Sequence, residues 1–392
     1  MNYKFPTITN ISDVLPHIKD RDEIIVAERE HFTVINYLVA FADTFPHPST
    51  ATTPEESLSF AMRRECRGLK FHPQTGDIIG RFYHKFFNLN EKIETQTNNI
   101  NWNLSFIILE KLDGSAIHPI ITDTGKIFMC TRMGMTDVAA QADYHIEKSF
   151  VDYLPFCRAI IKDGATPIFE WCSKKQRIVL LYPEDQLVLT AIRYNKSGNY
   201  LHHKKMFDIA KQYGIPVVNK WEGTFDGIER FVEENKVKTN EEGNVFRFDS
   251  GLMLKCKNDW YCEIHRAKDE IRFEKNLIRL HLEGNLDDVI PHLLAEDAVR
   301  VEAFVADFDI AVKNTIYQLR DVIEECGSIM NKKSFAAHNI EYYSAPERGI
   351  LFSIWDGHSA TSAVIKAILK KTGSQTQVNS VRSLFGVNWD DY

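Results

Sequence analysis

Short apolar or alternating runs recur along the chain as far as residue 257 and predict β-strands. Turn residues separate many of them, as at Asp123-Thr124-Gly125. Two pairs of runs are expected to form hairpins, over residues 23–40 and 116–131. The predicted strands cover residues 23–27, 32–40, 105–109, 116–122, 126–131, 167–171, 177–182, 186–193, 242–248 and 251–257.

Helical periodicity is less frequent in this part of the chain and predicts helices over residues 12–18, 138–154, 204–213 and 227–235. From about Ala267 the strand patterns stop and amphipathic helical patterns replace them. Asp297 is expected to cap a long helix, and residues 360–371 predict another. The change predicts a first domain over residues 1–267 and a helical domain over residues 268–392.

The composition is that of an ordinary water-soluble protein: 44% of the 392 residues are hydrophobic and 26% are charged. No apolar run approaches the roughly 20 residues of a membrane span, so we expect no membrane contact. The seven cysteines are scattered and form no Cys-x-x-Cys pair, which favours reduced thiols in the cytoplasm and gives no sign of a zinc site. Because the net charge is −7, the protein as a whole does not attract nucleic acid electrostatically. Any binding of nucleic acid must use local patches of basic residues.

Candidate chemistry begins at Lys111, which follows the apolar run 105–109 and precedes the turn Asp113-Gly114. A lysine held at the end of a strand can act as a nucleophile if burial or neighbouring cations release its proton. Taken alone, Lys-x-Asp-Gly is a weak signal, and a solvated hairpin lysine is then the preferred explanation of Lys111.

Further charged residues lie in apolar surroundings. Glu170 stands within a run of large hydrophobic residues, and Arg67 and Lys85 each have apolar neighbours, where a lone charge is costly unless it meets an anion. Lys255 and Lys257 are two apart on one predicted strand, so both side chains leave the same face. A solvated sheet face would explain the last pair, but together these residues describe a site where a lysine attacks a nucleoside triphosphate. The sequence contains neither a P-loop nor a Gly-x-Gly-x-x-Gly motif.

Seven motifs make the chain resemble the covalent lysyl-nucleotidyltransferases, and among them the bacteriophage RNA ligase 1 family. Their order and approximate spacing match that family over about residues 30–290. The most specific are the second motif and the last. In chain order they are Glu65-Cys66-Arg67-Gly68, Lys85-Phe86-Phe87-Asn88-Leu89-Asn90-Glu91, Lys111-Leu112-Asp113-Gly114-Ser115, Phe169-Glu170, Arg177-Ile178-Val179-Leu180, Glu242-Gly243 and Lys255-Cys256-Lys257-Asn258-Asp259-Trp260-Tyr261.

The resemblance implies an α+β fold with an antiparallel-sheet nucleotidyltransferase core, similar to ATP-grasp ligases, followed by an all-α C-terminal domain that helps to select the RNA. It implies an enzyme that joins RNA ends with ATP in three steps. Lys111 attacks the α-phosphate of ATP to form lysyl-AMP, the AMP passes to an RNA 5′-phosphate, and a 3′-OH then displaces it.

The resemblance also implies roles for single residues. Tyr37, Arg67 and Lys85 contact ATP, the last two at its phosphates, and Glu170 holds the ribose. Lys255 and Lys257 clamp the α-phosphate. Asp113 and Glu242 match essential carboxylates that serve Mg²⁺, for which Mn²⁺ can substitute, and Asp287 is the match to a metal-binding aspartate, with Asp288 beside it.

The implied partners are single-stranded RNA ends, above all tRNA broken in its anticodon loop, and we expect a monomer in the cytoplasm, that of the host cell if a phage encodes the protein. Two positions depart from the family pattern. Arg132 stands near the position of a usual lysine, and Asn244 replaces an aromatic or apolar residue.

Other interpretations stay open at this point. A DNA ligase or a non-ligating enzyme of the mRNA-capping type shares Lys-x-Asp-Gly, although the second and last motifs suit neither. The sequence does not fix ATP over GTP. An inactive RNA-binding relative is a different class, and it would need none of these lysines and carboxylates in this arrangement. A structural protein with a coincidental turn lysine is the remaining alternative.

Overall fold

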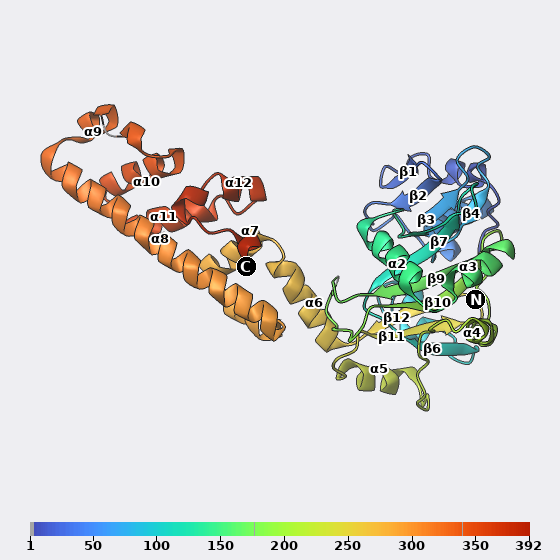
Figure 1. Ribbon diagram of the computed structural model, residues 1–392. Helices are drawn as coiled ribbons and strands as arrows, with labels where there is room; N and C mark the ends of the chain where they lie inside the picture. Colours follow the sequence, from blue (N-terminus) through green and yellow to red (C-terminus); the bar gives the residue numbers. More distant parts are fainter. Residues whose placement is uncertain (1–3, 176, 339) are drawn as a thin grey trace. The chain divides into compact units, whose positions relative to one another are not determined.

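The protein divides into two compact units, Met1–Tyr261 and Cys262–Tyr392, in a computed structural model that describes residues 4–175, 177–338 and 340–392 (Figure 1). The division falls within helix α6 (Asp259–Ile271), which also contains residue 267, where the sequence pattern changes. The first unit holds antiparallel sheets with helices, and the second is helical. The predicted fold class is therefore confirmed.

The first sheet has the order β1-β2-β3-β4, with neighbouring strands antiparallel. Helix α1 (Pro54–Glu65) begins after Thr53, whose hydroxyl oxygen accepts a hydrogen bond from the backbone amide of Glu56, and Pro54 lies in its first turn. Before the sheet, the predicted helix over residues 12–18 is two short 3-10 turns instead, η1 (Ile11–Asp13) and η2 (Leu15–His17). The strands and the helix of this part of the chain are β1 (Ile24–Glu28), β2 (Thr33–Tyr37), α1 (Pro54–Glu65), β3 (Arg67–Phe71) and β4 (Ile78–Gly80).

The second sheet has the order β10-β9-β7-β8 and carries a helical layer on one face. Alternation along β9 sends Phe169 and Trp171 into the core with these helices, so Glu170 leaves by the opposite face. The elements are β7 (Ser115–Ile121), β8 (Ile127–Cys130), α2 (Asp137–Lys148), α3 (Tyr153–Lys162), β9 (Ala165–Cys172), β10 (Gln186–Tyr194) and α4 (His203–Gln212).

The third sheet has the order β5-β12-β11-β6 and is antiparallel except for the parallel pair β5–β12. Along β12, Leu254 and Cys256 enter the core beneath helix α5, so Lys255 and Lys257 share the other face, as predicted. The elements are β5 (Phe87–Asn88), β6 (Phe106–Glu110), α5 (Ile228–Lys236), β11 (Gly243–Phe248) and β12 (Met253–Lys257).

A buried ion triad joins the first two sheets. The Glu65 carboxylate at the end of α1 lies 3.0 Å from Arg81 and 2.9 Å from Arg193, and all three side chains are fully buried. Despite its burial, the two guanidinium groups lower the pKa of Glu65 to about 2. The triad fixes the end of α1 directly before Arg67.

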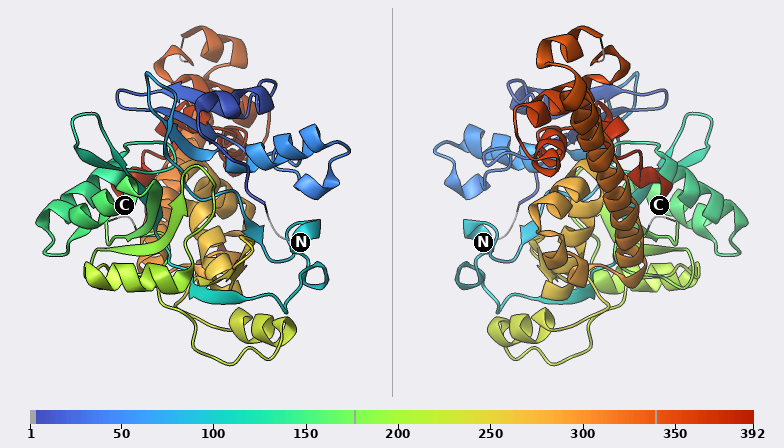
Figure 2. Two further views of the ribbon diagram at one scale, coloured as in Figure 1. Left: turned by 90° about the vertical axis from the view of Figure 1, so that its right-hand side faces the viewer. Right: turned by 90° about the vertical axis from the view of Figure 1, so that its left-hand side faces the viewer.

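The second unit is built around one long helix, α8, whose buried face includes Val301, Phe304 and Phe308 (Figures 1 and 2). Asp297 was expected as its cap, but the helix begins at Ala295, and Asp297 instead pairs with Lys268 at 3.3 Å. The elements are α7 (Glu274–Glu283), α8 (Ala295–Ile329), α9 (Lys332–His338), α10 (Ala345–Trp355), α11 (Ala360–Leu369) and α12 (Gln375–Asn379).

Besides the helix over residues 12–18, two further sequence predictions in the first unit are wrong. The single helix predicted over residues 138–154 is instead two helices, α2 and α3. The non-helical segment 149–152 separates them and leaves the side chain of Phe150 fully exposed. The predicted strand 177–182 is a loop, since the amides of Val179 and Leu180 donate to a buried carboxylate and not to a strand. None of the described helices combines the length and apolar character needed to cross a membrane.

Candidate active site

The nucleophile candidate Lys111 lies directly after β6, where its amide donates to the Gly243 carbonyl oxygen of β11 at 2.8 Å. Its ammonium lies 2.8 Å from Oε2 of Glu242, and the ammonium of Lys257 lies 2.8 Å from Oε1 of the same carboxylate. Glu242 is 3% exposed. The third sheet therefore places two half-buried lysines on one buried carboxylate.

Gly243 makes this arrangement possible. It has a φ of +129°, and a Cβ there would lie 2.2 Å from the carbonyl oxygen of Cys256. Any larger residue would push β11 away from β12 and separate Glu242 from Lys257. The predicted Glu242-Gly243 motif thus has a steric reason.

Lys255 lies on the same strand face as Lys257, with its ammonium 4.8 Å from the Phe86 ring centre. Burial, followed by the charges of Arg67, Lys111, Lys85 and Lys257, lowers the pKa of Lys255 to about 7. This strand face is consequently not an ordinary solvated one, because burial and the neighbouring cations disfavour the charged form of Lys255.

Tyr37 lies at the end of β2 among three cations. The Lys85 ammonium lies 5.3 Å from its ring centre and the Arg132 guanidinium lies 4.6 Å from it. Burial favours the neutral phenol, yet Arg67, Lys85 and Arg132 together hold the pKa of Tyr37 below its ordinary value. Arg132 therefore supplies a cation near Tyr37.

The cations here have no acidic partners. In the part of the chain that the structure describes, Arg67, Lys85, Arg132 and Lys255 form no ion pair, and Nη1 of Arg67 is buried without a hydrogen-bond partner. Unpaired cations in partly buried positions are costly unless an anion joins them. The site can thus accept a ligand with several negative charges.

Glu170 enters the site from β9, on the face opposite the helices. Burial raises its pKa to about 7, against the lowering effect of Lys111 and with a further rise from the Glu242 carboxylate. It forms no ion pair with the described residues. Its oxygens are therefore available to a ligand.

Asp113 is buried, and hydrogen bonds engage both of its oxygens. Oδ2 accepts from the amides of Val179 and Leu180, at 2.8 and 2.6 Å, and Oδ1 accepts from the Tyr261 hydroxyl at 2.7 Å. A metal could bind Asp113 only by displacing these donors. In this structure the carboxylate holds the turn after Lys111 against the loop that follows β9 and the start of α6.

We expect Asp113→Ala to destabilise the first unit by roughly 3 kcal/mol or more, because it leaves two buried amides and a hydroxyl without an acceptor. Tyr261→Phe removes only one donor and should cost about 1 kcal/mol, which makes it the matched comparison. Urea unfolding of both variants measures the two losses. Equal stability of Asp113→Ala and the parent protein would contradict this scaffold role.

Sequence reasoning missed a fully buried lysine, Lys70. Its ammonium is fully buried, contacts Nε2 of His118 at 2.8 Å and donates to the Thr131 carbonyl oxygen at 3.0 Å. These contacts hold the segment before Arg132 against β3. The only sign of burial in the sequence is that Lys70 stands between the apolar residues Leu69 and Phe71. A lysine between two apolar residues also occurs in strands whose lysine faces solvent, so this pattern does not identify a buried lysine.

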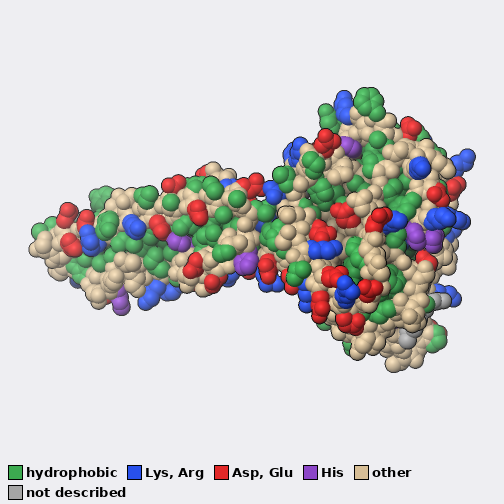
Figure 3. Space-filling view, turned by 90° about the horizontal axis from the view of Figure 1, so that it is seen from below, with side chains coloured by type: hydrophobic (Ala, Val, Ile, Leu, Met, Phe, Trp, Pro, Cys, Tyr) green, Lys and Arg blue, Asp and Glu red, His purple; other side chains and the backbone are tan. Residues whose placement is uncertain are grey.

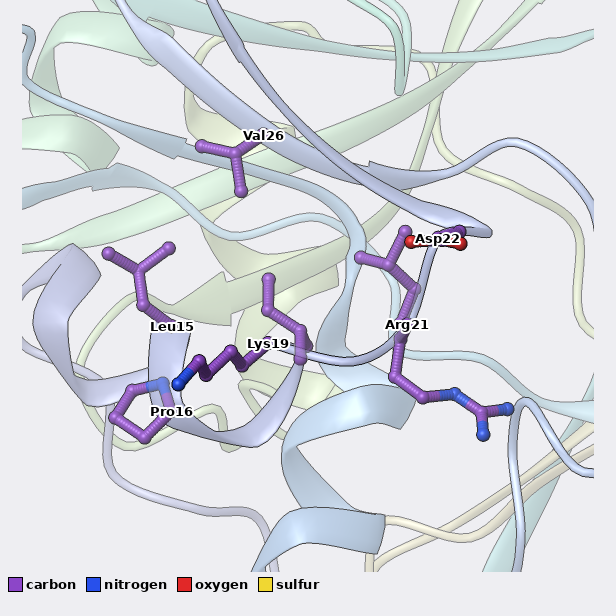
Figure 4. Close-up of a pocket in the computed structure, with 8 residues that line it drawn as sticks. Leu15, Pro16, Lys19, Arg21, Asp22 and Val26 are labelled. Atoms are coloured by element: carbon purple, nitrogen blue, oxygen red, sulfur yellow. The ribbon is translucent and has the colours of Figure 1, made fainter.

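Two further features lie apart from these residues. Asp287, the predicted metal ligand, is exposed in the 3-10 turn Leu286–Asp288 of the second unit, and its role remains a prediction. A hollow of about 570 Å³ beside β1 contains none of the predicted residues (Figure 4). Arg21 in that hollow is already paired with Glu23 and Asp43.

Comparison with known proteins places this site in a family. Residues 65–261 match the family model described as RNA ligase. The chain is 32% identical over 261 residues to the "Putative RNA ligase" of Thermovibrio ammonificans and 24% identical over 264 residues to RNA ligase 1 of bacteriophage TS2126. Each alignment covers 65% of this chain and 65% of the relative, so the chain spans about two thirds of the length of either protein.

Among solved structures, an archaeal ATP-dependent RNA ligase aligns with a TM-score of 0.45 and 13% identity, over 65% of this chain and 63% of that one. The Naegleria gruberi RNA ligase with pyrophosphate aligns with a TM-score of 0.37 and 18% identity, over 46% and 57%. The family model covers half of the 392 residues and contains every predicted site residue except Tyr37 and Asp287. The chain belongs to the RNA ligase family.

Proposed function

We propose that this protein is an ATP-dependent RNA ligase that joins RNA 5′-phosphate and 3′-OH ends through lysyl-AMP and an adenylylated RNA 5′ end. The observation that carries the proposal is the group of unpaired cations, Arg67, Lys85, Arg132 and Lys255, around a lysine held at a strand end. A polyphosphate supplies the negative charge that these residues lack.

In the first step, the Lys111 ammonium gives up a proton to water and its neutral nitrogen attacks the α-phosphorus of ATP, so that the new N–P bond forms and the bond to pyrophosphate breaks. Pyrophosphate leaves with the electron pair. The nitrogen becomes acidic as it bonds to phosphorus, and the Glu242 carboxylate, 2.8 Å away, is positioned to take its proton. Lys255 and Lys257 stabilise the charge that develops on the α-phosphate oxygens.

Other residues bind and orient the nucleotide. Arg67 and Lys85 hold the phosphates, Tyr37 contacts the nucleotide, and Glu170 accepts hydrogen bonds from the ribose hydroxyls. A carboxylate with a pKa of about 7 is half protonated at pH 7, so ribose binding through Glu170 should improve as the pH rises through 7. In the later steps the same cations hold the AMP phosphate while an RNA 5′-phosphate and then a 3′-OH attack.

Mg²⁺, or Mn²⁺ in its place, would accompany the bound triphosphate. Mg²⁺ in such sites takes phosphate oxygens, water and one or two carboxylates. We propose that phosphate oxygens and water would hold most of the ion's ligand positions, because lysines already pair with Glu242, hydrogen bonds engage Asp113, and Glu170 is proposed to bind the ribose. Asp287, in the second unit, is proposed as a metal ligand on the resemblance alone. When bound, the ion neutralises phosphate charge.

The RNA substrate is proposed to be a tRNA broken in its anticodon loop, chosen with the help of the second unit. On the face seen in Figure 3, basic and acidic side chains are interspersed. RNA contacts on such a surface must be local, as the net charge of −7 also requires.

Nucleotide binding should take up a proton above neutral pH. Lys255 has a pKa of about 7 and is mostly neutral at pH 8.5, whereas a bound phosphate favours the ammonium form and raises the pKa. Titration calorimetry with the α,β-methylene analogue of ATP, in buffers of different ionisation enthalpy, measures the uptake. We expect a substantial fraction of one proton for the parent protein and for the exposed-lysine control Lys126→Ala, and little for Lys255→Met. Equal uptake by Lys255→Met would contradict the assignment.

The proposed function is tested by incubating the protein with Mg²⁺, α-labelled ATP and a 5′-phosphorylated single-stranded RNA. Label should appear first on the protein, in the acid-labile and alkali-stable bond expected of a phosphoramidate, then on the RNA, and should leave as AMP on sealing. Competition with unlabelled GTP distinguishes ATP from GTP. Label that stays on the protein in the presence of RNA would point to a non-ligating nucleotidyltransferase instead.

A further inference from the structure

A second cavity, of about 810 Å³, lies in the first unit beside the candidate active site. Its volume is within the range of ~300–1,000 Å³ typical of ligand pockets. Helix α1 and the 3-10 turn Pro48–Thr50 line one side, and β5 with the turn Ile93–Thr95 lines another. Of the predicted site residues, only Lys85 borders it.

The cavity is aromatic and basic. Four phenylalanines line it, together with hydroxyl and amide side chains such as Ser57 and Asn99. Its charged residues are Lys4, Arg64, Lys85 and Glu94, and the last pairs with Arg64 at 2.5 Å. Three cations against one acid leave a surplus of two positive charges, in a chain whose net charge is −7. The phenylalanines are Phe5, Phe86, Phe87 and Phe248.

Two adjacent residues connect this cavity to the active site. The Lys85 ammonium lies 5.2 Å from the ring centre of Phe87 on the cavity side and 5.3 Å from that of Tyr37 on the active-site side. Phe86 lines the cavity while its ring contacts the ammonium of Lys255. A chain of nucleotides in the cavity would therefore reach the proposed phosphate site across Lys85.

We propose that this cavity binds one or two nucleotides of the single-stranded RNA whose end is being joined, a proposal that rests on the proposed ligase function. Grooves for single-stranded nucleic acid combine cations that follow the backbone with aromatic rings that stack on the bases. This cavity has the cations, and Phe86 is its partly exposed ring, because Phe5, Phe87 and Phe248 are at most 7% exposed. Ile93 and Leu58 are 81% and 43% exposed at the cavity, which gives the bases an apolar surface on entry. The nucleotides belong either to the 5′-phosphate strand or to the 3′-OH strand, since both present the same chemistry.

The first test uses the full chain with the double substitution Leu58→Glu/Ile93→Glu, which adds negative charge at exposed positions of the cavity. The matched control is Leu15→Glu/Val237→Glu, at positions 39% and 80% exposed that do not line it. Fluorescence anisotropy measures the Kd of two labelled octamers. One has a 5′-phosphate and a blocked 3′ end, and the other has a 3′-OH and no 5′-phosphate.

We expect the cavity variant to raise Kd about tenfold for one of the octamers, which identifies the strand, and the control to change neither. Lysyl-AMP formation from ATP should stay at the parental rate in both. Unchanged Kd for both octamers, or loss of lysyl-AMP formation in the cavity variant alone, would overturn the proposal. Absence of lysyl-AMP in the parent protein would instead refute the proposed function, while the anisotropy result still reports on the cavity.

A second test needs no substitution. A 4-thiouridine next to the end of each octamer should photocross-link to peptides that contain residues 84–87, 93–101 or 248–253. Cross-links confined to other parts of residues 4–261 would show that RNA does not occupy the cavity.

Discussion

Lys111→Ala and Lys111→Arg should each abolish covalent attachment of AMP while the fold stays intact. Lys111 is 20% exposed by its side chain and lies outside the hydrophobic clusters, so its loss leaves the packing unchanged. Arginine keeps the charge beside Glu242 but cannot be deprotonated at working pH and so cannot attack phosphorus. The measurement is the amount of label from α-labelled ATP that stays on the denatured protein at neutral or alkaline pH.

Sealing of a pre-adenylylated RNA separates this step from the later ones. Because the AMP is already on the RNA, both Lys111 variants should retain part of the sealing activity of the parent protein. Lys126→Ala, an exposed lysine on the β7–β8 hairpin, is the control that should take up label normally. Uptake of label from ATP by Lys111→Ala would show that another residue is the nucleophile.

Lys255→Ala and Lys257→Ala should each slow lysyl-AMP formation by about 10²–10³-fold, the usual cost of losing a positioned charged donor in the transition state. ATP affinity should fall much less, because Arg67 and Lys85 still hold the phosphates. Lys257 shares the Glu242 carboxylate with Lys111, so its loss should also alter the environment of the nucleophile. Single-turnover rates of lysyl-AMP formation over a range of ATP concentrations separate the two effects.

The double variant decides whether the two lysines serve one phosphate. If both stabilise the same developing charge, the loss in the double variant should be well below the product of the single losses. Independent losses that multiply, or defects limited to ATP affinity, would mean that the strand face has no part in the transition state.

The sequence allowed the face of β12 to be predicted, because a period of two alone decides that Lys255 and Lys257 point the same way. It could not show that Glu242 joins Lys111 to Lys257, since that contact depends on the pairing of β11 with both β6 and β12. The wrong prediction of a strand over residues 177–182 has a similar cause, because a distant side chain accepts the hydrogen bonds of this segment. The segment 177–182 has a strand-like pattern, but its amides reach Asp113, 66 residues earlier in the chain for Val179, and no local pattern records this. The burial of Lys70 could not be predicted for the same reason, because its partners His118 and Thr131 are far along the chain and belong to another sheet.

The carboxylate shared by Lys111 and Lys257 also bears on the direction of the proposed reaction. Once Lys111 carries AMP, its nitrogen is neutral and a phosphate anion lies beside it, so Glu242 is left with a single ammonium partner. The loaded protein has therefore lost one positive charge and gained one negative charge at the place where a triphosphate binds. A second ATP is repelled by this change, and rebinding of pyrophosphate is disfavoured in the same way. The loaded state thus disfavours its own precursor by charge, and the terminal phosphate of an RNA, which carries fewer charges than ATP or pyrophosphate, is repelled less.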